Sequence, residues 1–226
     1  MRKIILGTSN QEKIEDLILA LKIYSPEFVH DNDRNIVSLR DIEDSGFIIN
    51  IANENGYTVE ENCMSKLYFY KSILDKIDEF HGSLLISEDT GLFIRQLDWN
   101  PGVHTARFAG DHDFDKLGRK VMELMNGVND RFAFVKSAVG ATVIGSGEDS
   151  TKMESDVMYG SISDYIYSGN GFAFDKIFMK ESDNITLAEM CNKYKLQRLY
   201  IPRFQCINGL MNDRDWLRVI NGSLTF

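Results

Sequence analysis

The start of the chain places the tightest constraint on its fold. Residues 2–6, which end in three apolar residues, predict a β-strand, and a helix predicted over residues 10–23 follows almost at once. The apolar side chains of this helix recur at i, i+3, i+4 and i+7, the pattern of one buried face (Ile14, Leu17, Ile18 and Leu21). A strand that leads directly into a helix is a building unit of α/β folds.

The remaining sequence continues the alternation and then becomes richer in strands. In chain order we expect a strand at 47–51, a helix at 60–80, strands at 84–87 and 92–97 on either side of a turn at 88–91, a helix at 113–125, long strands at 131–144 and 150–162, a strand at 172–178 and a short helix at 186–194. This order predicts a mixed α/β fold. A groove between two lobes of such a fold is a natural ligand site.

Composition narrows the class of protein. Of the 226 residues, 43% are hydrophobic and 26% charged, as in an ordinary soluble globular protein. The net charge of −9 argues against a nucleic-acid polymer as partner, because such binders carry a basic face. The sequence has no signal-peptide h-region and no apolar run of membrane-spanning length. The three cysteines are odd in number and far apart, so we expect no disulfide framework and a cytoplasmic location.

The junction between the first strand and the first helix is a candidate phosphate site. Backbone N–H groups and the helix dipole favour an anion there. Thr8 and Asn10 add neutral hydrogen-bonding groups, and Lys13 adds a positive charge one turn into the helix. The alternative is ordinary helix capping by Ser9 or Asn10, with Lys13 in solvent.

A second candidate lies at the start of the helix predicted over 60–80. Asn62 and Lys66 are four residues apart and therefore share a helix face. Glu61 is placed to hold a metal ion while Lys66 reaches a phosphate. The alternative is a capping box, because Thr58 and Glu61 have the required spacing.

The adjacent acids Glu88 and Asp89 form a third candidate. They follow an apolar strand and precede Gly91. Mg²⁺ binds one or two carboxylates together with phosphate oxygens and waters, and one such carboxylate can also activate an attacking water. The alternative is a plain turn, in which acidic residues beside glycine are common.

Two glycine-containing segments complete the set. The segment 101–110 is either part of a site or a structured loop. In the segment 169–175, Phe172 is placed to stack on a base and Asp175 to accept from a ring N–H. The alternative is that Phe172 and Phe174 are core residues of a strand.

The order of these motifs carries more information than any one of them. Along the chain they read Thr8-x-Asn10-x-x-Lys13, Glu61-Asn62-x-x-x-Lys66, Glu88-Asp89-Thr90-Gly91-Leu92, Pro101-Gly102-x-x-x-Ala106-Arg107-Phe108-Ala109-Gly110, Gly171-Phe172-x-Phe174-Asp175-x-Ile177-Phe178 and Thr186-x-Ala188-Glu189. This series resembles the inosine triphosphate pyrophosphatase family, from residue 1 to about residue 195. Members of that family remove deaminated purine nucleotides such as ITP, dITP and XTP.

The resemblance implies an elongated α/β fold of two lobes around a central mixed sheet. It further implies one domain over residues 1–226, with the nucleotide in the cleft between the lobes, and a homodimer. The implied triphosphate ligands are Thr8, Asn10, Lys13, Asn62 and Lys66. The implied Mg²⁺ ligands are Glu61, Glu88 and Asp89. Asp89 is the favoured residue for activating water, Phe172 would stack on the base, and Asp175 and Lys195 would lie close to it.

The sequence departs from the family pattern at three places. Glu88-Asp89 stands where the family has two aspartates, and Lys176 stands where it has a proline. The Ser-His-Arg motif that helps to recognise the purine base has no full match. Arg203 can fill the arginine's role if residues are inserted before it, but the serine and the histidine have no counterpart. The base specificity is therefore less determined than the phosphate chemistry.

Three functional hypotheses follow. The first is Mg²⁺-dependent hydrolysis of deaminated purine triphosphates to the monophosphate and pyrophosphate. The second keeps the reaction but takes an ordinary or modified nucleotide as substrate. The third is a non-catalytic nucleotide-binding regulatory protein, against which the retained Lys13, Glu61, Lys66 and Asp89 argue, because a binder needs no water-activating carboxylate.

Overall fold

The chain divides into two units of structure. The computed structural model describes residues 3–29, 35–110, 114–171, 173–193, 199 and 201–223. Unit 1 consists of Met1–Asp89, Ala138–Ser155 and Arg203–Phe226, and unit 2 of Thr90–Ser137 and Asp156–Pro202. Within the described residues, no helix is both long enough and apolar enough to span a membrane.

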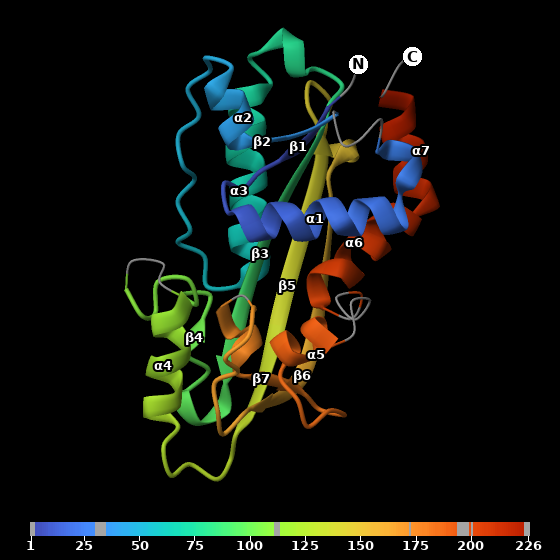
Figure 1. Ribbon diagram of the computed structural model, residues 1–226. Helices are drawn as coiled ribbons and strands as arrows, with labels where there is room; N and C mark the ends of the chain where they lie inside the picture. Colours follow the sequence, from blue (N-terminus) through green and yellow to red (C-terminus); the bar gives the residue numbers. More distant parts are fainter. Residues whose placement is uncertain are drawn as a thin grey trace. The chain divides into compact units, whose positions relative to one another are not determined.

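The sheet has both parallel and antiparallel strands (Figure 1). Seven strands can be assigned in the described residues, in the order β2-β1-β3-β5-β6-β7, with β4 beside β3. Their bounds are β1 Ile4–Leu6, β2 Ile36–Ser38, β3 Leu84–Ile94, β4 Pro101–Gly102, β5 Phe132–Val143, β6 Lys152–Ile162 and β7 Phe178–Lys180. Strand β1 is parallel to β2 and to β3, whereas β3–β4 and β6–β7 are antiparallel pairs. The predicted mixed α/β fold is confirmed.

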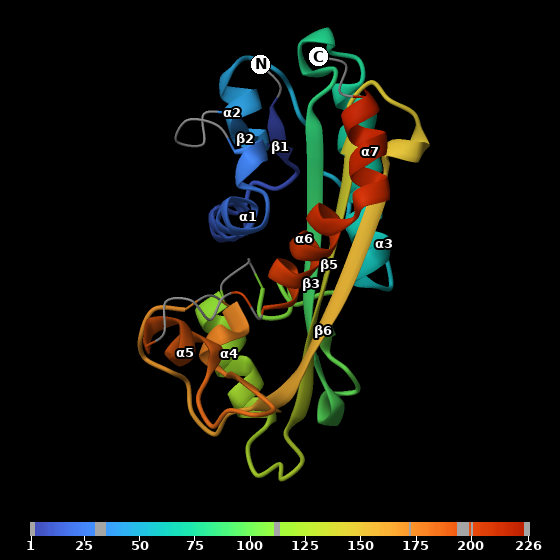
Figure 2. The same ribbon diagram turned by 90° about the vertical axis from the view of Figure 1, so that its right-hand side faces the viewer.

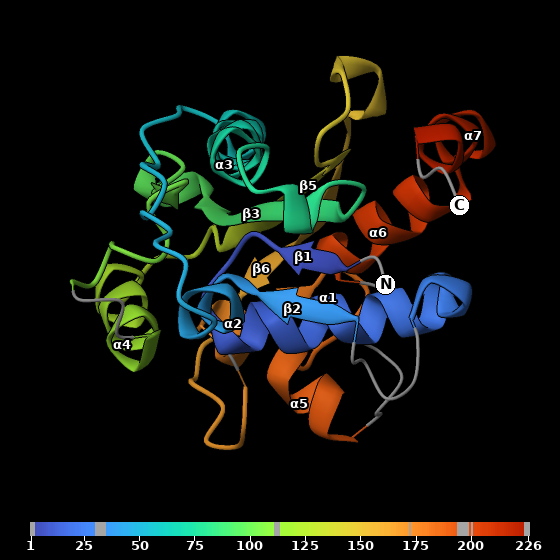
Figure 3. The same cartoon turned by 90° about the horizontal axis from the view of Figure 1, so that it is seen from above.

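In unit 1 the strands that follow β1 are added on both sides of it, β2 on one side and β3 on the other. Its helices are α1 Gln11–Tyr24, α2 Leu39–Asp44, α3 Val59–Leu74, α6 Pro202–Asn212 and α7 Arg214–Ser223. Because β2 and β3 lie on opposite sides of β1, right-handed connections bring α1 and α3 to opposite faces of the sheet (Figure 3). Ligands of α/β sheets bind at such a reversal of strand order, outside the carboxyl ends of the strands.

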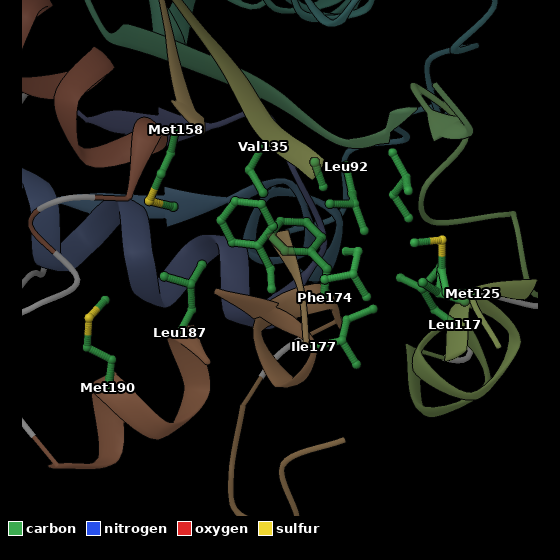
Figure 4. Close-up of a cluster of buried hydrophobic side chains, with 14 residues drawn as sticks. Leu92, Leu117, Met125, Val135, Met158, Phe174, Ile177, Leu187 and Met190 are labelled. Carbon is green, nitrogen blue, oxygen red and sulfur yellow. The ribbon is translucent and has the colours of Figure 1, made fainter. Parts of the chain in front are cut away.

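Unit 2 has an apolar core of its own. Its helices are α4 Phe114–Leu124 and α5 Leu187–Lys193, and a 3₁₀ turn covers Ala173–Lys176. Figure 4 shows side chains from these elements pointing toward one another and toward the strands. Phe174 and Ile177 lie in the middle of this buried cluster, with Leu187 from α5 and Leu117 from α4.

The C-terminal segment folds as two helices, which the sequence patterns did not predict. Helices α6 and α7 lie beside the β5–β6 hairpin of unit 1 (Figure 2). Trp216 is 5% exposed, and its indole N–H donates to the carbonyl of Ser150 at 2.8 Å. Asp213 accepts from the backbone N–H groups of Asp215 and Trp216 and also pairs with Lys152. The tail is thus an integral part of unit 1.

Four predicted elements differ from the structure. Residues 47–51 have no regular structure, and the edge strand is β2 instead. The long predicted helix ends at Leu74, where Asp75 caps it. The predicted turn at 88–91 is wrong, because β3 runs unbroken from Leu84 to Ile94. The strand predicted at 172–178 is also wrong. Its described residues form the 3₁₀ turn, a single turn residue and the first residue of β7, and the side chains of Phe174, Ile177 and Phe178 lie in the core of unit 2.

Candidate active site

The site begins where the parallel pairing of β1 with β3 ends. The last paired residues are Leu6 and Ile86, and the backbone N–H of Gly7 donates to the Ile86 carbonyl at 2.7 Å. A Cβ on Gly7 would collide with the hydroxyl of Ser87, which is fully buried, and would lie 3.1 Å from the Ile86 carbonyl oxygen. Glycine therefore allows this close approach of the two strands, which a side chain would disturb.

The Asn10 side chain caps the N-terminus of helix α1, as the capping alternative predicted. The Asn10 side chain accepts from the backbone N–H groups of Glu12 and Lys13 at 3.1 and 3.2 Å. The Thr8 hydroxyl accepts from the N–H of Asn10 at 3.2 Å. The other half of that alternative is wrong, because the Lys13 side chain is not in solvent. It is 18% exposed and points back to strand β3.

The two acids on β3 are buried within the strand rather than exposed in a turn. The Glu88 side chain is fully buried and makes ion pairs with Lys13 and with Arg203. Asp89 lies 3.3 Å from the ammonium of Lys66 and 4.0 Å from that of Lys13. A strand tolerates adjacent buried carboxylates because cations from three helices neutralise them.

Helix α3 presents a buried polar face to Asp89. Asn62 donates to the Asp89 carboxylate at 3.2 Å, and Lys66 pairs with both Asp89 and Glu54. Asn62 also accepts from the N–H of Gly56 at 2.8 Å. The shared helix face predicted for Asn62 and Lys66 is therefore confirmed.

Glu61 lies on a different face of the same helix. Its backbone N–H donates to the Thr58 hydroxyl at 3.1 Å, and its carboxylate accepts from the N–H of Tyr57 at 2.7 Å. The side chain is exposed and serves as part of the helix cap. Across the part of the chain that is described, no group of three or more His, Cys, Asp or Glu residues is arranged to hold a metal ion. The role of Glu61 as a metal ligand stays a prediction.

The pKa values of the two acids on β3 are shifted in opposite directions. Burial would raise the pKa of Glu88, but Arg203, Lys13 and Lys66 outweigh it and hold the pKa well below its ordinary value. Burial raises the pKa of Asp89 above its ordinary value, against the opposing attraction of Lys66 and Lys13. Burial would lower the pKa of Lys66, but Asp89, Glu54 and Glu88 raise it, so its ammonium stays charged. Two neighbouring acids whose pKa values are shifted in opposite directions are suited to two different roles.

Three residues of this cluster were missed by the sequence patterns. Asp16 binds Arg203 at 2.8 Å, Glu54 binds Lys66 at 2.7 Å, and Ser87 packs against Gly7. Asp16 carries one usable signal, since it lies three residues after Lys13 on the same helix face. Glu54 and Ser87 carry none, because only the fold brings them to the site.

The remaining candidates belong to unit 2. Asp175 lies in the 3₁₀ turn at 173–176 and is 8% exposed. Phe172 and Lys195 lie outside the described residues. The segment 101–110 begins with β4 and continues in turns, and its role in a site stays a prediction. The Thr105 hydroxyl accepts from the N–H of Leu92 at 2.9 Å and donates to the Gly102 carbonyl at 2.6 Å, which fixes the start of these turns against β3.

Comparison with known proteins finds relatives over most of the chain. A model of the Ham1 family matches residues 4–211. The chain is 33% identical over 193 residues to a dITP/XTP pyrophosphatase of Caldanaerobacter subterraneus, covering 84% of this chain and 86% of the relative. It is 28% identical over 199 residues to a dITP/XTP pyrophosphatase of Staphylococcus aureus, covering 87% and 89%.

Solved structures share the fold. The Ham1 protein of Staphylococcus aureus superposes with a TM-score of 0.69 at 23% identity, covering 96% of this chain and 99% of that one. A HAM1 protein of Coxiella burnetii gives 0.65 at 22% identity, covering 98% and 100%. The resemblance inferred from the ordered motifs is confirmed, and the chain belongs to the Ham1 family.

Proposed function

We propose that this protein is a nucleoside triphosphate pyrophosphatase that cleaves between the α and β phosphates and takes deaminated purine nucleotides such as ITP, dITP and XTP. The names of its relatives support the substrate class. The observation that carries the chemistry is the convergence of Lys13 and Lys66 on Asp89, at the strand-order reversal in unit 1.

The chain's own residues provide for the phosphates. The N-terminus of α1 offers backbone N–H groups and a positive dipole end, and Thr8 and Asn10 shape the turn that leads into it. Lys13 and Lys66 carry the positive charge, and Asn62 orients the Asp89 carboxylate between them. Together they would bind the triphosphate and stabilise the departing pyrophosphate.

Asp89 is the residue best suited to activate water. Its raised pKa makes it the better proton acceptor of the acid pair, while Glu88 stays ionised beside it. A water held by Asp89 would attack the α-phosphorus in line with the leaving pyrophosphate. Lys13 and Lys66 would take up the charge that develops on that group.

The acid pair also fits Mg²⁺ by its donor chemistry. Carboxylate oxygens from Glu88 and Asp89 match the one or two carboxylates that Mg²⁺ takes alongside phosphate oxygens, and Glu61 is the further candidate. Four carboxylates and three cations already leave this cluster one negative charge in excess (Asp16, Glu54, Glu88 and Asp89 against Lys13, Lys66 and Arg203). A bound Mg²⁺ would supply the positive charge that an added triphosphate requires.

The base would be recognised by residues of other segments. Asp175 is proposed to accept from the ring N–H of a 6-oxo purine, Phe172 to stack on the ring, and Lys195 to lie nearby. The predicted contact of Arg203 with the base is less well supported, because its guanidinium already binds two carboxylates.

A nucleotide panel tests the substrate assignment. We expect pyrophosphate release from ITP and XTP, in the presence of Mg²⁺, with kcat/KM at least about a hundredfold above that for dATP and dGTP. Pyrophosphate assays with and without Mg²⁺ measure this. Release that favours dATP would keep the reaction and reject the deaminated substrate. Absence of release from every nucleotide would reject the enzyme assignment.

An aromatic surface on unit 2 supports a homodimer. The ring of Phe93 stacks on that of Phe134 at 4.7 Å, and Trp99 and Tyr159 extend the group while remaining 45% and 53% exposed. Exposed aromatic clusters of this kind mark protein interfaces. We expect Tyr159→Glu to reduce the mass in light scattering to that of one chain, whereas Tyr68→Glu on α3 leaves it unchanged. Equal masses for wild type and Tyr159→Glu would place the interface elsewhere.

The cysteines agree with a cytoplasmic location. All three lie within the described residues, and none of them forms a disulfide. Burial raises the pKa of the Cys63 thiol to about 12, which keeps it protonated and unreactive.

A further inference from the structure

Arg203 is a buried cation at the end of a helix where a positive charge is unfavourable. It occupies the first turn of α6, where the helix dipole disfavours a positive charge. The residue is nonetheless 4% exposed, and such burial of a cation requires compensating partners. The partners are two carboxylates from elements far away in the sequence.

These contacts close a ring of charges within unit 1. The guanidinium Nη1 donates to Asp16 at 2.8 Å, and Nε donates to Glu88 at 3.1 Å. The other oxygen of Glu88 pairs with Lys13. Lys13 and Asp16 lie three residues apart on α1, so this helix joins the two ends of the series of contacts and closes the ring.

The ring fixes groups that the proposed reaction uses. Glu88 is held by one cation on each carboxylate oxygen, which sets its rotamer and the direction of Lys13. The rigid fork of an arginine can hold two carboxylates at a defined angle, whereas a lysine cannot. The geometry points to Arg203 as a positioning residue that acts through Glu88 and Asp16 to hold Lys13 and the start of α1 in place for the triphosphate. This inference rests on the proposed function and replaces base reading as the task of Arg203.

Inorganic tripolyphosphate separates positioning from base reading, because it has phosphates but no base. We expect Arg203→Met to weaken inhibition by Mg²⁺-tripolyphosphate about tenfold, and to lower kcat/KM by the same factor for ITP, XTP and dATP. Asp16→Asn should have the same effect, and the double variant should lose no more than either single variant. Arg218→Met, at an exposed arginine, is the matched control and should behave as wild type.

Folding is monitored by near-ultraviolet circular dichroism and a cooperative thermal transition. If Arg203→Met does not fold, Arg203→Lys keeps the charge without the fork, and it should lose tripolyphosphate affinity in the same direction.

The alternatives give different results. Loss confined to ITP and XTP, with unchanged tripolyphosphate inhibition, would overturn the inference in favour of base reading. If the losses of tripolyphosphate affinity in the two single variants add up in the double variant, Arg203 and Asp16 act independently, and the inference that they form one ring is overturned. A wild-type protein that hydrolyses no triphosphate and does not bind tripolyphosphate would overturn the proposed function, and the inference with it.

Discussion

At the scale of single residues, the two acids of β3 differ in environment although they are neighbours in the sequence. Three cations hold the pKa of Glu88 down, while burial raises that of Asp89. A carboxyl group whose pKa is raised in the folded protein contributes stability that is complete below its unfolded pKa and is lost as the pH rises through its folded pKa. Ionisation of the buried Asp89 therefore costs stability, which is common at sites built for chemistry.

The substitution Asp89→Asn separates the contribution of this carboxyl group to catalysis from its effect on stability. We expect kcat to fall by at least about a hundredfold, the range of a lost general base, while the melting temperature at pH 7 does not fall. Pyrophosphate release and calorimetry measure the two quantities. Asp78→Asn, at a fully exposed side chain, is the control for the loss of a surface carboxylate. Activity within tenfold of wild type would remove Asp89 from the mechanism.

The close approach at Gly7 makes a second prediction at this scale. We expect Gly7→Ala to lower the free energy of unfolding by about 1–3 kcal/mol, because its Cβ meets Ser87 and the Ile86 carbonyl in a fully buried place. Adding Ser87→Gly should restore part of the loss. Gly147→Ala, which meets nothing within 4 Å, should leave stability unchanged in the same urea titration. Equal stability of the Gly7 and Gly147 variants would contradict this reading of the junction.

At the scale of elements, local patterns predicted those features that depend on local contacts. The 3.6-residue period placed α1, and the β-rich segments placed β5 and β6. The turn predicted at 88–91 failed for a non-local reason. Acids next to glycine indicate a turn unless distant cations neutralise them, and here Lys13, Lys66 and Arg203 do so.

The same distinction applies to the site. Lys13, Asn62, Lys66 and the acid pair became candidates because each lies in a motif of the ordered series that resembles the family, and the structure brings them together. Asp16 and Glu54 could not, because their roles arise from contacts with residues on other elements. Ser87 had no partner in the sequence that would mark it, and only the parallel register of β1 and β3 brings it to Gly7.

Helix α7 gives a prediction about an element. We expect Trp216→Ala to destabilise the protein by about 3–5 kcal/mol, since it removes a buried indole and its hydrogen bond to Ser150. The kcat of the folded fraction at low temperature should not change, because α7 carries none of the proposed site residues. Val219→Ala, at a side chain that is 39% exposed, is the matched control on the same helix. A large fall in kcat of a fully folded Trp216 variant would give the tail a part in the reaction.

At the scale of the whole molecule, an acidic protein is proposed to bind a polyanion. The net charge is −9, so the affinity for a triphosphate has to come from local cations and a metal ion rather than from the overall field. Lys66 is buried and Lys13 half-buried, and both are paired with carboxylates, so both are fixed before the substrate arrives. Preorganised charge of this kind favours the transition state more than the ground state.

The fate of a labelled water tests the proposed bond cleavage. ITP is hydrolysed by the wild-type protein in H₂¹⁸O with Mg²⁺, and the products are weighed by mass spectrometry. Attack at the α-phosphorus predicts one ¹⁸O atom in the inosine monophosphate and none in the pyrophosphate. Label in the pyrophosphate, or release of orthophosphate with the diphosphate as the other product, would contradict cleavage by a water that Asp89 directs to the α-phosphorus.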